Sequence, residues 1–230
     1  MIQIGKEFIR NVHYPDLIEA LSLGFNAEIN TPLRNHYNYE NPQSEKESTL
    51  LIMPSWQVGE RLGVKLVTVS PENAKLNLPS IHGQYILFDA INGKPIALLD
   101  GKMLTSIRTA AVSAMVSRYL SREDSKTLLM VGTGELAPEL IKAHCSVRPI
   151  EKVFIWGRNK EKSEQLAANL EVKNVSFSSV NRIEDIVQEV DIISAATLSE
   201  KPLIYGDLLK CGQHVDLVGA YQPHMRESDN

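Results

Sequence analysis

A glycine-rich stretch in the second half of the chain has the residue types and spacing of a phosphate-binding loop. In VGTGELAPEL, Gly132, Gly134 and Ala137 follow the pattern G-x-G-x-x-A. The first glycine permits a tight turn, the second lets the backbone approach a pyrophosphate, and the small third residue lets a helix pack closely. The N-terminus of that helix would offer its N–H groups to the phosphates. The alternative is a plain strand-to-helix turn.

The surroundings of this motif favour phosphate binding over a plain turn. TLLMV predicts a strand before it, ELAPELIKAHC predicts a helix after it, and KVFIWG begins a second strand roughly twenty residues later. A strand, a glycine loop, a helix and a second strand form the unit that binds dinucleotides. We therefore predict a dinucleotide site that also includes Thr133 and Leu136, two of the residues between the motif positions.

The end of the second strand bears on the choice between NADPH and NADH. It reads VFIWGRNKEK, so Arg158, Asn159 and Lys160 precede the first acid, Glu161. A carboxylate there would bind the ribose hydroxyls of NADH, whereas Arg158 and Lys160 can pair with the 2'-phosphate of NADPH. Asn159 is predicted to contact the same end of the cofactor. The alternative is that these residues are solvated and open the next helix. We predict NADPH, with NADH as the alternative.

Arg108 is a cation on an apolar face of a predicted helix. A helix is expected from about Ser106 to Leu120, with Thr105 or Ser106 as its N-cap, so Arg108 falls in the first turn, where a cation opposes the helix dipole. Apolar side chains follow it at i+4, i+7 and i+11. Such a cation is expected to meet an anion: a substrate carboxylate, with Thr109 near enough to reach a phosphate, or an acid from the other half of the chain.

Lys65 interrupts GVKLVTV, a strand that is apolar on both faces, and shares its side with Val67 and Val69. A desolvated lysine can have its pKa shifted into a range useful for acid–base chemistry. The alternative is an edge-strand lysine whose ammonium group reaches water.

The chain before Gly101 predicts an antiparallel or mixed sheet with one helix. Residues 7–28 carry apolar positions at helical spacing, with Pro15 at the helix start. Residues 31–54 predict a strand, a polar loop and a strand, and RLGVKLVTVSP predicts another strand. In QYILFDAINGKPIALLDG, Asn92-Gly93 can supply the positive φ of a hairpin turn.

Beyond the Ala-rich helix, strands and helices alternate. After the glycine loop come KVFIWG, KEKSEQLAANL, VSF, IEDIVQEV, DIISAA and HVDLVG, with IEDIVQEV expected as a helix. Such alternation predicts a parallel sheet with crossover helices, and therefore an α/β fold class. The boundary between the two halves is expected near Ser121, with the helix packed between them.

Composition narrows the possible partners. The net charge of -4, the pI near 5.9 and the scattered basic residues argue against nucleic acid. Apolar runs are shorter than the ~18 residues of a membrane span, and MIQIGKEFIR lacks the charged-then-apolar pattern of a signal peptide, so no membrane partner is expected. The six histidines lack metal-binding spacing, and the two cysteines are too few for a disulfide framework, so we expect no metal and a cytoplasmic setting.

Several motifs together resemble the ornithine cyclodeaminase/mu-crystallin family. They are GVKLVTVSPEN, LPSIHGQYILFDAINGKP, LLDGKMLTSIRTAAVSAMVSRYL, VGTGELA, VFIWGRN and HVDLVGAYQPHMRESD. The resemblance implies a substrate-binding and dimerisation domain, residues 1–120, and a Rossmann NAD(P)-binding domain, residues 121–230. It also implies a homodimer. Relatives usually continue into C-terminal helices, which a chain ending at Asn230 is expected to lack.

The resemblance assigns roles to individual residues. Arg34, Lys65 and Arg108 match the family's substrate-carboxylate and catalytic cations, with Lys65 and Arg108 in catalysis. The cofactor contacts it implies are Thr109, Gly132, Gly134, Ala137, Arg158, Thr197, Val218 and Gly219.

One departure from the family pattern bears on the reaction. Ornithine cyclodeaminases place an Asp after the VGG element, and the matching residue in LVGAYQP is Tyr221, which cannot hold an ammonium group by charge. This favours the family's reductases, which reduce a small cyclic imino acid such as Δ1-pyrroline-2-carboxylate to proline with NAD(P)H. Ornithine cyclodeamination and a non-catalytic NADPH-binding protein remain the alternatives.

Overall fold

The chain folds into two units, and its longest helix lies mainly in the second. The computed structural model describes residues 1–230, apart from the side chain of Ala74. Unit 1 contains residues Met1–Val12 and Ser22–Thr105, and unit 2 contains His13–Leu21 and Ser106–Asn230. The division therefore falls before Ser106 rather than near Ser121. The cause is an alanine-rich helix face, whose buried side chains share one core with the strands of unit 2.

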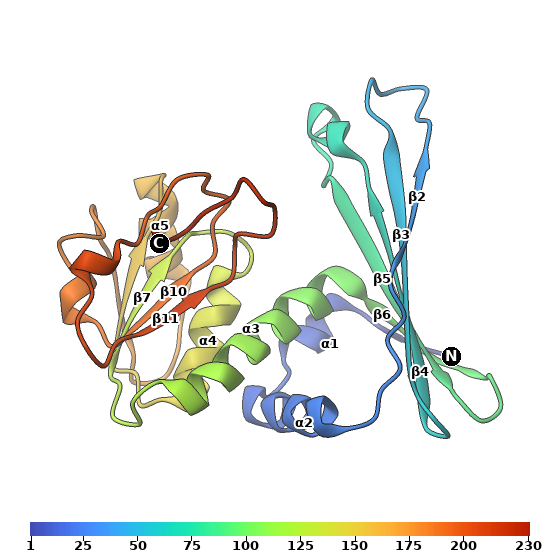
Figure 1. Cartoon of the computed structure of the whole chain (residues 1–230), viewed down its shortest axis with the longest axis horizontal. Coiled ribbons are helices and arrows are strands. Elements are labelled where there is room, and N and C mark those ends of the chain that lie inside the picture. The colour runs from blue at the N-terminus through green and yellow to red at the C-terminus, as the bar shows by residue number, and fades with distance from the viewer. The chain divides into compact units, whose positions relative to one another are not determined.

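Unit 1 is built on a sheet with the strand order β1-β6-β5-β4-β3-β2 (Figure 1). β1 pairs with β6 in parallel, and the other pairs are antiparallel, as expected for strands joined by hairpins. The strands are β1 (Ile2–Ile4), β2 (Asn35–Tyr39), β3 (Ser48–Gln57), β4 (Arg61–Val69), β5 (Ile81–Asp89) and β6 (Pro95–Asp100). The remaining elements are α1 (Lys6–Arg10), η1 (Pro71–Leu76) and the end of α2 (Tyr14–Asn26). Residues 7–28 thus form parts of two helices rather than one.

The turn between β5 and β6 confirms the predicted hairpin in a longer form. Gly93 has a φ of +71° and supplies the left-handed conformation. Asn92 contributes through its side chain, which accepts a hydrogen bond from the Lys94 N–H at 2.9 Å. The Asp89 carboxylate accepts from the Ile91 N–H at 2.8 Å and closes the start of the loop.

The register of the sheet in unit 1 sorts its side chains onto two faces. Met53, Lys65, Tyr85 and Leu99 are register partners and share one face. The alternate residues point to the other face, which we call the apolar face. The large apolar side chains on it are half-buried: Leu50, Ile52, Trp56, Leu62, Val64, Leu66, Ile86, Phe88 and Leu98.

Unit 2 contains the predicted parallel sheet, with the strand order β11-β10-β7-β8-β9. Figure 1 shows this sheet with α4 and α5 beside it. The strands are β7 (Thr127–Val131), β8 (Lys152–Trp156), β9 (Ser176–Ser179), β10 (Ile192–Ala195) and β11 (His214–Leu217). The crossover helices are α4 (Ala137–Val147) and α5 (Lys160–Asn169). Leu128, Met130 and Ile192 are fully buried, which is typical of parallel strands covered on both faces.

The segment IEDIVQEV does not form the predicted helix. It folds into turns and the short 3-10 helix η2 (Val187–Glu189), and a further 3-10 helix, η3 (Gly206–Leu208), precedes β11. Ile183, Ile186, Val187 and Val190 are nevertheless buried together against the sheet. Ile and Val have a low helix propensity, because β-branched side chains lose freedom in a helix. The turns bury these side chains without a helix.

The Ala-rich helix α3 (Gly101–Leu120) begins earlier than predicted. The Asp100 carboxylate accepts a hydrogen bond from the Met103 N–H at 2.7 Å and acts as the N-cap. Thr105 and Ser106 are therefore inside the helix, and Arg108 lies beyond its first turn. The predicted opposition between Arg108 and the helix dipole is wrong, because that effect is confined to the terminal turn. Over the described residues, no helix has the length and apolar content needed to cross a bilayer.

Candidate functional site

The glycine loop joins β7 to α4 with the geometry that its sequence predicts. Gly132 has a φ of +122°, a conformation that disfavours side chains, and its N–H donates to the Trp156 carbonyl at 2.8 Å. A side chain on Gly134 would meet open space, so its backbone is accessible. Ala137 is the first residue of α4 and is completely buried, which lets the helix pack closely on the sheet.

A pocket of about 280 Å³ opens at this loop. It lies where β7, β8 and β10 end, the position at which open α/β sheets bind ligands. Among the predicted cofactor residues, the lining includes Gly132, Thr133, Gly134, Arg158 and Thr197. We call this space the cofactor pocket. Its lining also contains residues that sequence reasoning did not single out: Trp156, Gly157, Ala196, Leu198, Ser199 and Leu203.

Arg158 brings positive charge to the cofactor pocket. It lies two residues after the end of β8, is exposed and lines the pocket. Lys160, the other cation predicted to pair with a 2'-phosphate, lies at the start of α5 and forms an exposed ion pair with Glu164 at 3.6 Å. Asn159 serves as the N-cap of α5, where its side chain accepts from the Lys162 N–H at 3.0 Å. Its predicted contact with the cofactor stays a prediction.

Other predicted cofactor residues are not part of the pocket lining. Leu136 precedes α4 as its N-cap residue, and Thr109 lies on α3. The Val218 N–H donates to the Ala195 carbonyl at 2.8 Å, which continues the pairing of β10 with β11. Gly219 is buried against the backbone of Thr197, where a side chain would have no room. Val218 and Gly219 thus shape the neighbouring loop.

A buried acid supports the wall of the cofactor pocket. Glu227 is 2% exposed, and its carboxylate accepts hydrogen bonds from Thr197 and from the Gly219 N–H. Sequence reasoning did not identify Glu227. It lies 30 residues from Thr197 in the chain, so no local spacing connects the two.

Lys65 lies at the centre of the sheet in unit 1. Its strand, β4, runs between β3 and β5, so the edge-strand alternative is wrong. Its Nζ donates to the Thr105 hydroxyl at 2.7 Å, and that hydroxyl donates to the Gly101 carbonyl at 2.6 Å. The lysine is half-buried, and this hydrogen bond joins it to the first turns of α3.

The other predicted substrate residues are exposed. Arg34 precedes β2 in unit 1, and Arg108 projects from α3 in unit 2. Although much of the Arg108 residue is accessible, desolvation by its surroundings lowers the pKa of its guanidinium group below the usual value. Tyr221 follows β11 and is 70% exposed. Exposed guanidinium groups remain available to an anionic ligand.

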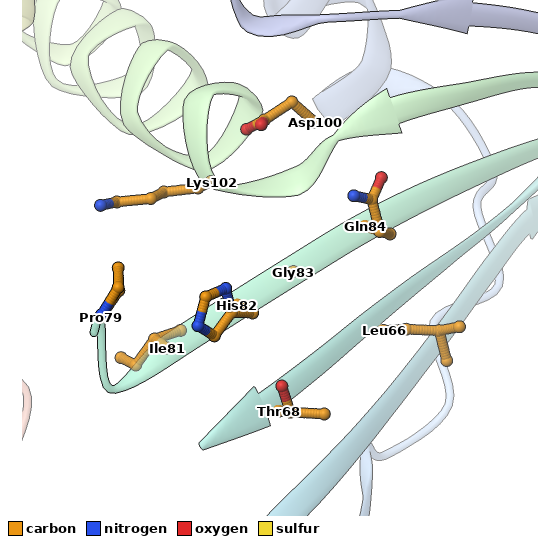
Figure 2. Close-up of a pocket in the computed structure, with 9 residues that line it drawn as sticks. All are labelled: Leu66, Thr68, Pro79, Ile81, His82, Gly83, Gln84, Asp100 and Lys102. Atoms are coloured by element: carbon orange, nitrogen blue, oxygen red, sulfur yellow. The ribbon is translucent and has the colours of Figure 1, made fainter. Parts of the chain in front are cut away.

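A separate hollow of about 290 Å³ lies in unit 1, at one end of its sheet. Figure 2 shows Leu66 and Thr68 on β4, His82 and Gln84 on β5, and Lys102 at the start of α3 around it. Leu66 belongs to the apolar face, so this hollow and Lys65 lie on opposite sides of the sheet. The hollow is therefore separate from the predicted catalytic lysine. Within the described part of the chain, no group of three or more His, Cys, Asp or Glu could hold a metal ion.

Comparison with known proteins identifies relatives along most of the chain. Protein SAR DEFICIENT 4 of Arabidopsis thaliana is 43% identical over 212 residues, covering 89% of this chain and 64% of that protein. A Δ1-pyrroline-2-carboxylate reductase of Colwellia psychrerythraea is 37% identical over 223 residues, covering 96% of this chain and 70% of the enzyme. The chain thus spans about two thirds of the length of these relatives.

A solved structure agrees with the fold as well as with the sequence. Thermococcus litoralis Δ1-pyrroline-2-carboxylate reductase, solved in complex with NADH and L-proline, superposes with a TM-score of 0.85 at 29% identity. The match covers 100% of this chain and 72% of that one. Residues 3–230 match the ornithine cyclodeaminase/mu-crystallin family. With a Rossmann unit and relatives of this kind, the chain belongs to the ornithine cyclodeaminase/mu-crystallin family.

Proposed function

We propose that this chain is a nicotinamide-dependent oxidoreductase that reduces a small cyclic imino acid, with Δ1-pyrroline-2-carboxylate converted to proline as the reaction. The observation that carries the proposal is the glycine loop at the cofactor pocket in a chain whose relatives include Δ1-pyrroline-2-carboxylate reductases. A bound dinucleotide fits this loop, because Gly132 permits the turn, Gly134 leaves the backbone open, and α4 begins beside it. When bound, a reduced nicotinamide supplies the hydride that the imine carbon accepts.

The residues of the chain would orient the substrate and supply the proton. Arg34 and Arg108 are proposed to hold the substrate carboxylate, because guanidinium groups pair with carboxylates in a bidentate geometry. Lys65 is proposed to polarise the imine or to relay the proton that its nitrogen gains as the carbon gains hydride. Carbon and nitrogen of the C=N bond then each carry one new hydrogen, which gives the cyclic amino acid.

For the cofactor, we propose NADPH in preference to NADH. Arg158 at the pocket supports this choice, and the stretch from Trp156 to Lys160 contains no acid that would favour a free ribose hydroxyl. The Thermococcus enzyme was solved with NADH. We therefore expect NADH to bind this chain weakly rather than to be excluded. The cytoplasmic location expected from the cysteine content remains a prediction.

A direct assay tests the reaction. NADPH and then NADH are mixed with the protein and Δ1-pyrroline-2-carboxylate, and the loss of nicotinamide absorbance is followed with proline as the measured product. Oxidation with stoichiometric proline is the expected result. Ammonia release from ornithine with added NAD would instead favour cyclodeamination. Cofactor binding without oxidation of either dinucleotide would favour a non-catalytic binding protein.

A further inference from the structure

Glu227 joins two loops at the wall of the cofactor pocket. One carboxylate oxygen, Oε1, accepts from the Thr197 N–H at 2.6 Å and from the Thr197 hydroxyl at 2.8 Å. The other, Oε2, accepts from the Gly219 N–H at 2.7 Å. Thr197 follows β10 and Gly219 follows β11, which are neighbouring strands. A single side chain therefore fixes the two loops to each other at the carboxyl ends of the sheet.

The backbone around Glu227 holds the acid in this position. The Leu203 and Ile204 N–H groups donate to the Glu227 carbonyl at 2.9 and 3.0 Å. On the next residues, the Asp229 N–H donates to the Ile204 carbonyl, and the Asp229 carboxylate accepts from the Gly206 N–H at 2.9 Å. The segment that carries Glu227 is thus paired along residues 203–206.

Burial of the Glu227 carboxylate carries a free-energy cost. Removing an ion from water costs free energy unless hydrogen bonds replace its hydration. The groups that donate to Glu227 are two backbone N–H groups and a hydroxyl, all neutral. An ionised acceptor satisfies all three at once, and charge-assisted hydrogen bonds are stronger than neutral ones. The arrangement also commits the Thr197 hydroxyl proton to Glu227, which fixes how that hydroxyl faces the pocket.

We propose that Glu227 is a positioning residue for the nicotinamide dinucleotide. It acts through Thr197, which lines the cofactor pocket, and through Gly219, whose backbone packs against Thr197. The proposal rests on the proposed function, because it concerns the pocket assigned there to the cofactor. Loss of the carboxylate would leave the fold of the sheet in place while loosening one wall of the pocket.

The central test is Glu227→Gln with Asp191→Asn as the matched control. Glutamine has the shape of glutamate, but its amide nitrogen would face an N–H donor at Thr197 or at Gly219. Asp191 is also a carboxylate that accepts from backbone, at 2.8 Å from the Lys126 N–H and 3.0 Å from the Thr127 N–H. It lies at the amino ends of β7 and β10, the opposite end of the same sheet from the pocket.

We would compare the parent, Glu227→Gln and Asp191→Asn. For each protein the experiment measures the dissociation constants of NADPH and NADH, the thermal midpoint, and kcat and cofactor KM separately. Glu227→Gln is expected to weaken both cofactors by about tenfold or more, mainly as a rise in KM. Asp191→Asn is expected to lower the thermal midpoint while changing affinity by less than about twofold, because the two sites are distant. A Glu227→Gln protein that binds within twofold of the parent would overturn the proposal, as would an equal loss of affinity in the control. A parent that binds neither cofactor would overturn the proposed function instead.

Hydrogen exchange on the parent gives an answer even where Glu227→Gln does not fold. Addition of NADPH is expected to slow exchange at the amides of Thr197, Gly219 and the segment 226–229 together. The amides of Lys126 and Thr127, at the other end of the sheet, should be unchanged and serve as the internal control. Protection of the glycine loop without any change in segment 226–229 would mean that Glu227 does not position the cofactor.

Discussion

At the end of β8, Arg158 is the cation that lines the cofactor pocket, and Arg158→Ala tests the choice of cofactor. If it pairs with the 2'-phosphate, the charge-assisted hydrogen bond contributes about 1.5–3 kcal/mol. We expect NADPH to bind roughly tenfold to a hundredfold more weakly in the variant and NADH to be nearly unchanged. Titration of both cofactors by nicotinamide fluorescence measures this.

Lys126→Ala is the control for that titration, because Lys126 is an exposed cation paired with Glu151 at 2.7 Å before the start of β7, at the opposite end of the sheet from the pocket. It should leave both affinities unchanged. Equal weakening of NADH and NADPH in Arg158→Ala would show that the arginine has a structural role. Tighter binding of NADH than of NADPH by the parent would reverse the proposed cofactor preference.

Lys65 is the residue proposed to move the proton, and Lys65→Ala should lower kcat by ~10²-fold or more. The reason is that a general acid acts in the transition state, so its loss appears in turnover rather than in cofactor binding. Steady-state kinetics at saturating NADPH provide the measurement. Lys75→Ala, which removes a surface lysine paired with Glu72, is the control and should keep the parent kcat. Near-normal turnover in Lys65→Ala would remove Lys65 from the mechanism.

Residues in local motifs could be predicted from the sequence, and residues that act across the chain could not. The spacing of Gly132, Gly134 and Ala137 predicts their role, because the loop and the helix that they form are contiguous in the sequence. Glu227 and Thr197 are brought together by the pairing of loops around β10 and β11. The apolar strand around Lys65 marks it as unusual, but its hydrogen bond with Thr105 depends on where α3 begins.

The C-terminal end of α3 depends on one buried arginine from the loop after α4. Arg148 is 8% exposed and donates to the Ser121 hydroxyl at 2.8 Å and to the carbonyls of Arg118 and Ser121 at 2.6 and 2.9 Å. Carbonyls at a helix end lack partners within the helix, so the guanidinium satisfies groups that would otherwise be buried unpaired.

Arg148→Ala is therefore expected to lower the free energy of unfolding by about 2–4 kcal/mol. Urea denaturation followed by circular dichroism measures the change. Arg182→Ala is a suitable control, because that exposed arginine pairs only at 3.4 Å with Glu184, and surface pairs contribute about 1 kcal/mol or less. A loss below that level in Arg148→Ala would contradict the assigned capping role.

Asp216 ties β11 to three neighbouring elements. Its carboxylate accepts from Ser113 on α3 and from Ser194 on β10 at 2.9 Å, and it lies 3.3 Å from His144 Nε2 on α4. Burial opposes the charge, but the hydrogen bonds with His144, Ser113 and Ser194 outweigh it and hold the pKa of Asp216 below its usual value.

A lowered pKa in the folded state gives this carboxylate a pH-dependent contribution to stability. The contribution is complete above the unfolded pKa of Asp, about 3.9, and is lost as the pH falls through the lower folded value. The difference in unfolding free energy between the parent and Asp216→Asn should thus be largest near neutral pH and shrink in acid. Denaturation of both proteins across that range measures it. A difference that is constant with pH would show that Asp216 does not act through its charge.

Helix boundaries were less predictable than strands for a physical reason. Asp100 caps α3 although Thr105 and Ser106 also have capping side chains, and the choice is made by the end of β6, which delivers Asp100 to the helix start. In IEDIVQEV the apolar spacing matched a helix, but buried β-branched residues form turns there instead. Strands β7, β8 and β10 were recognised because continuous apolar runs are typical of buried parallel strands.

At the scale of the whole molecule, the apolar face of unit 1 bears on assembly. Val64, Leu66 and Ile86 on this face are only half-buried, although each is a large apolar side chain on a central strand. Sheet faces of this kind promote association unless another surface covers them. A second copy of the chain would offer the same face, and a two-fold axis would pair the two. We therefore propose a C2 homodimer formed by unit 1.

Light scattering of the parent at micromolar concentration is expected to give twice the mass of one chain. Ile86→Lys should reduce the measured mass to that of one chain, because the dimer would have to bury the lysine charge in its interface. Leu23→Lys is the matched control: Leu23 is 66% exposed on α2 in unit 1 and lies outside the apolar face, so the dimer should persist. Circular dichroism confirms that each variant is folded before its mass is compared. A monomeric parent would contradict the proposed dimer, and a folded Ile86→Lys dimer would move the interface to another surface.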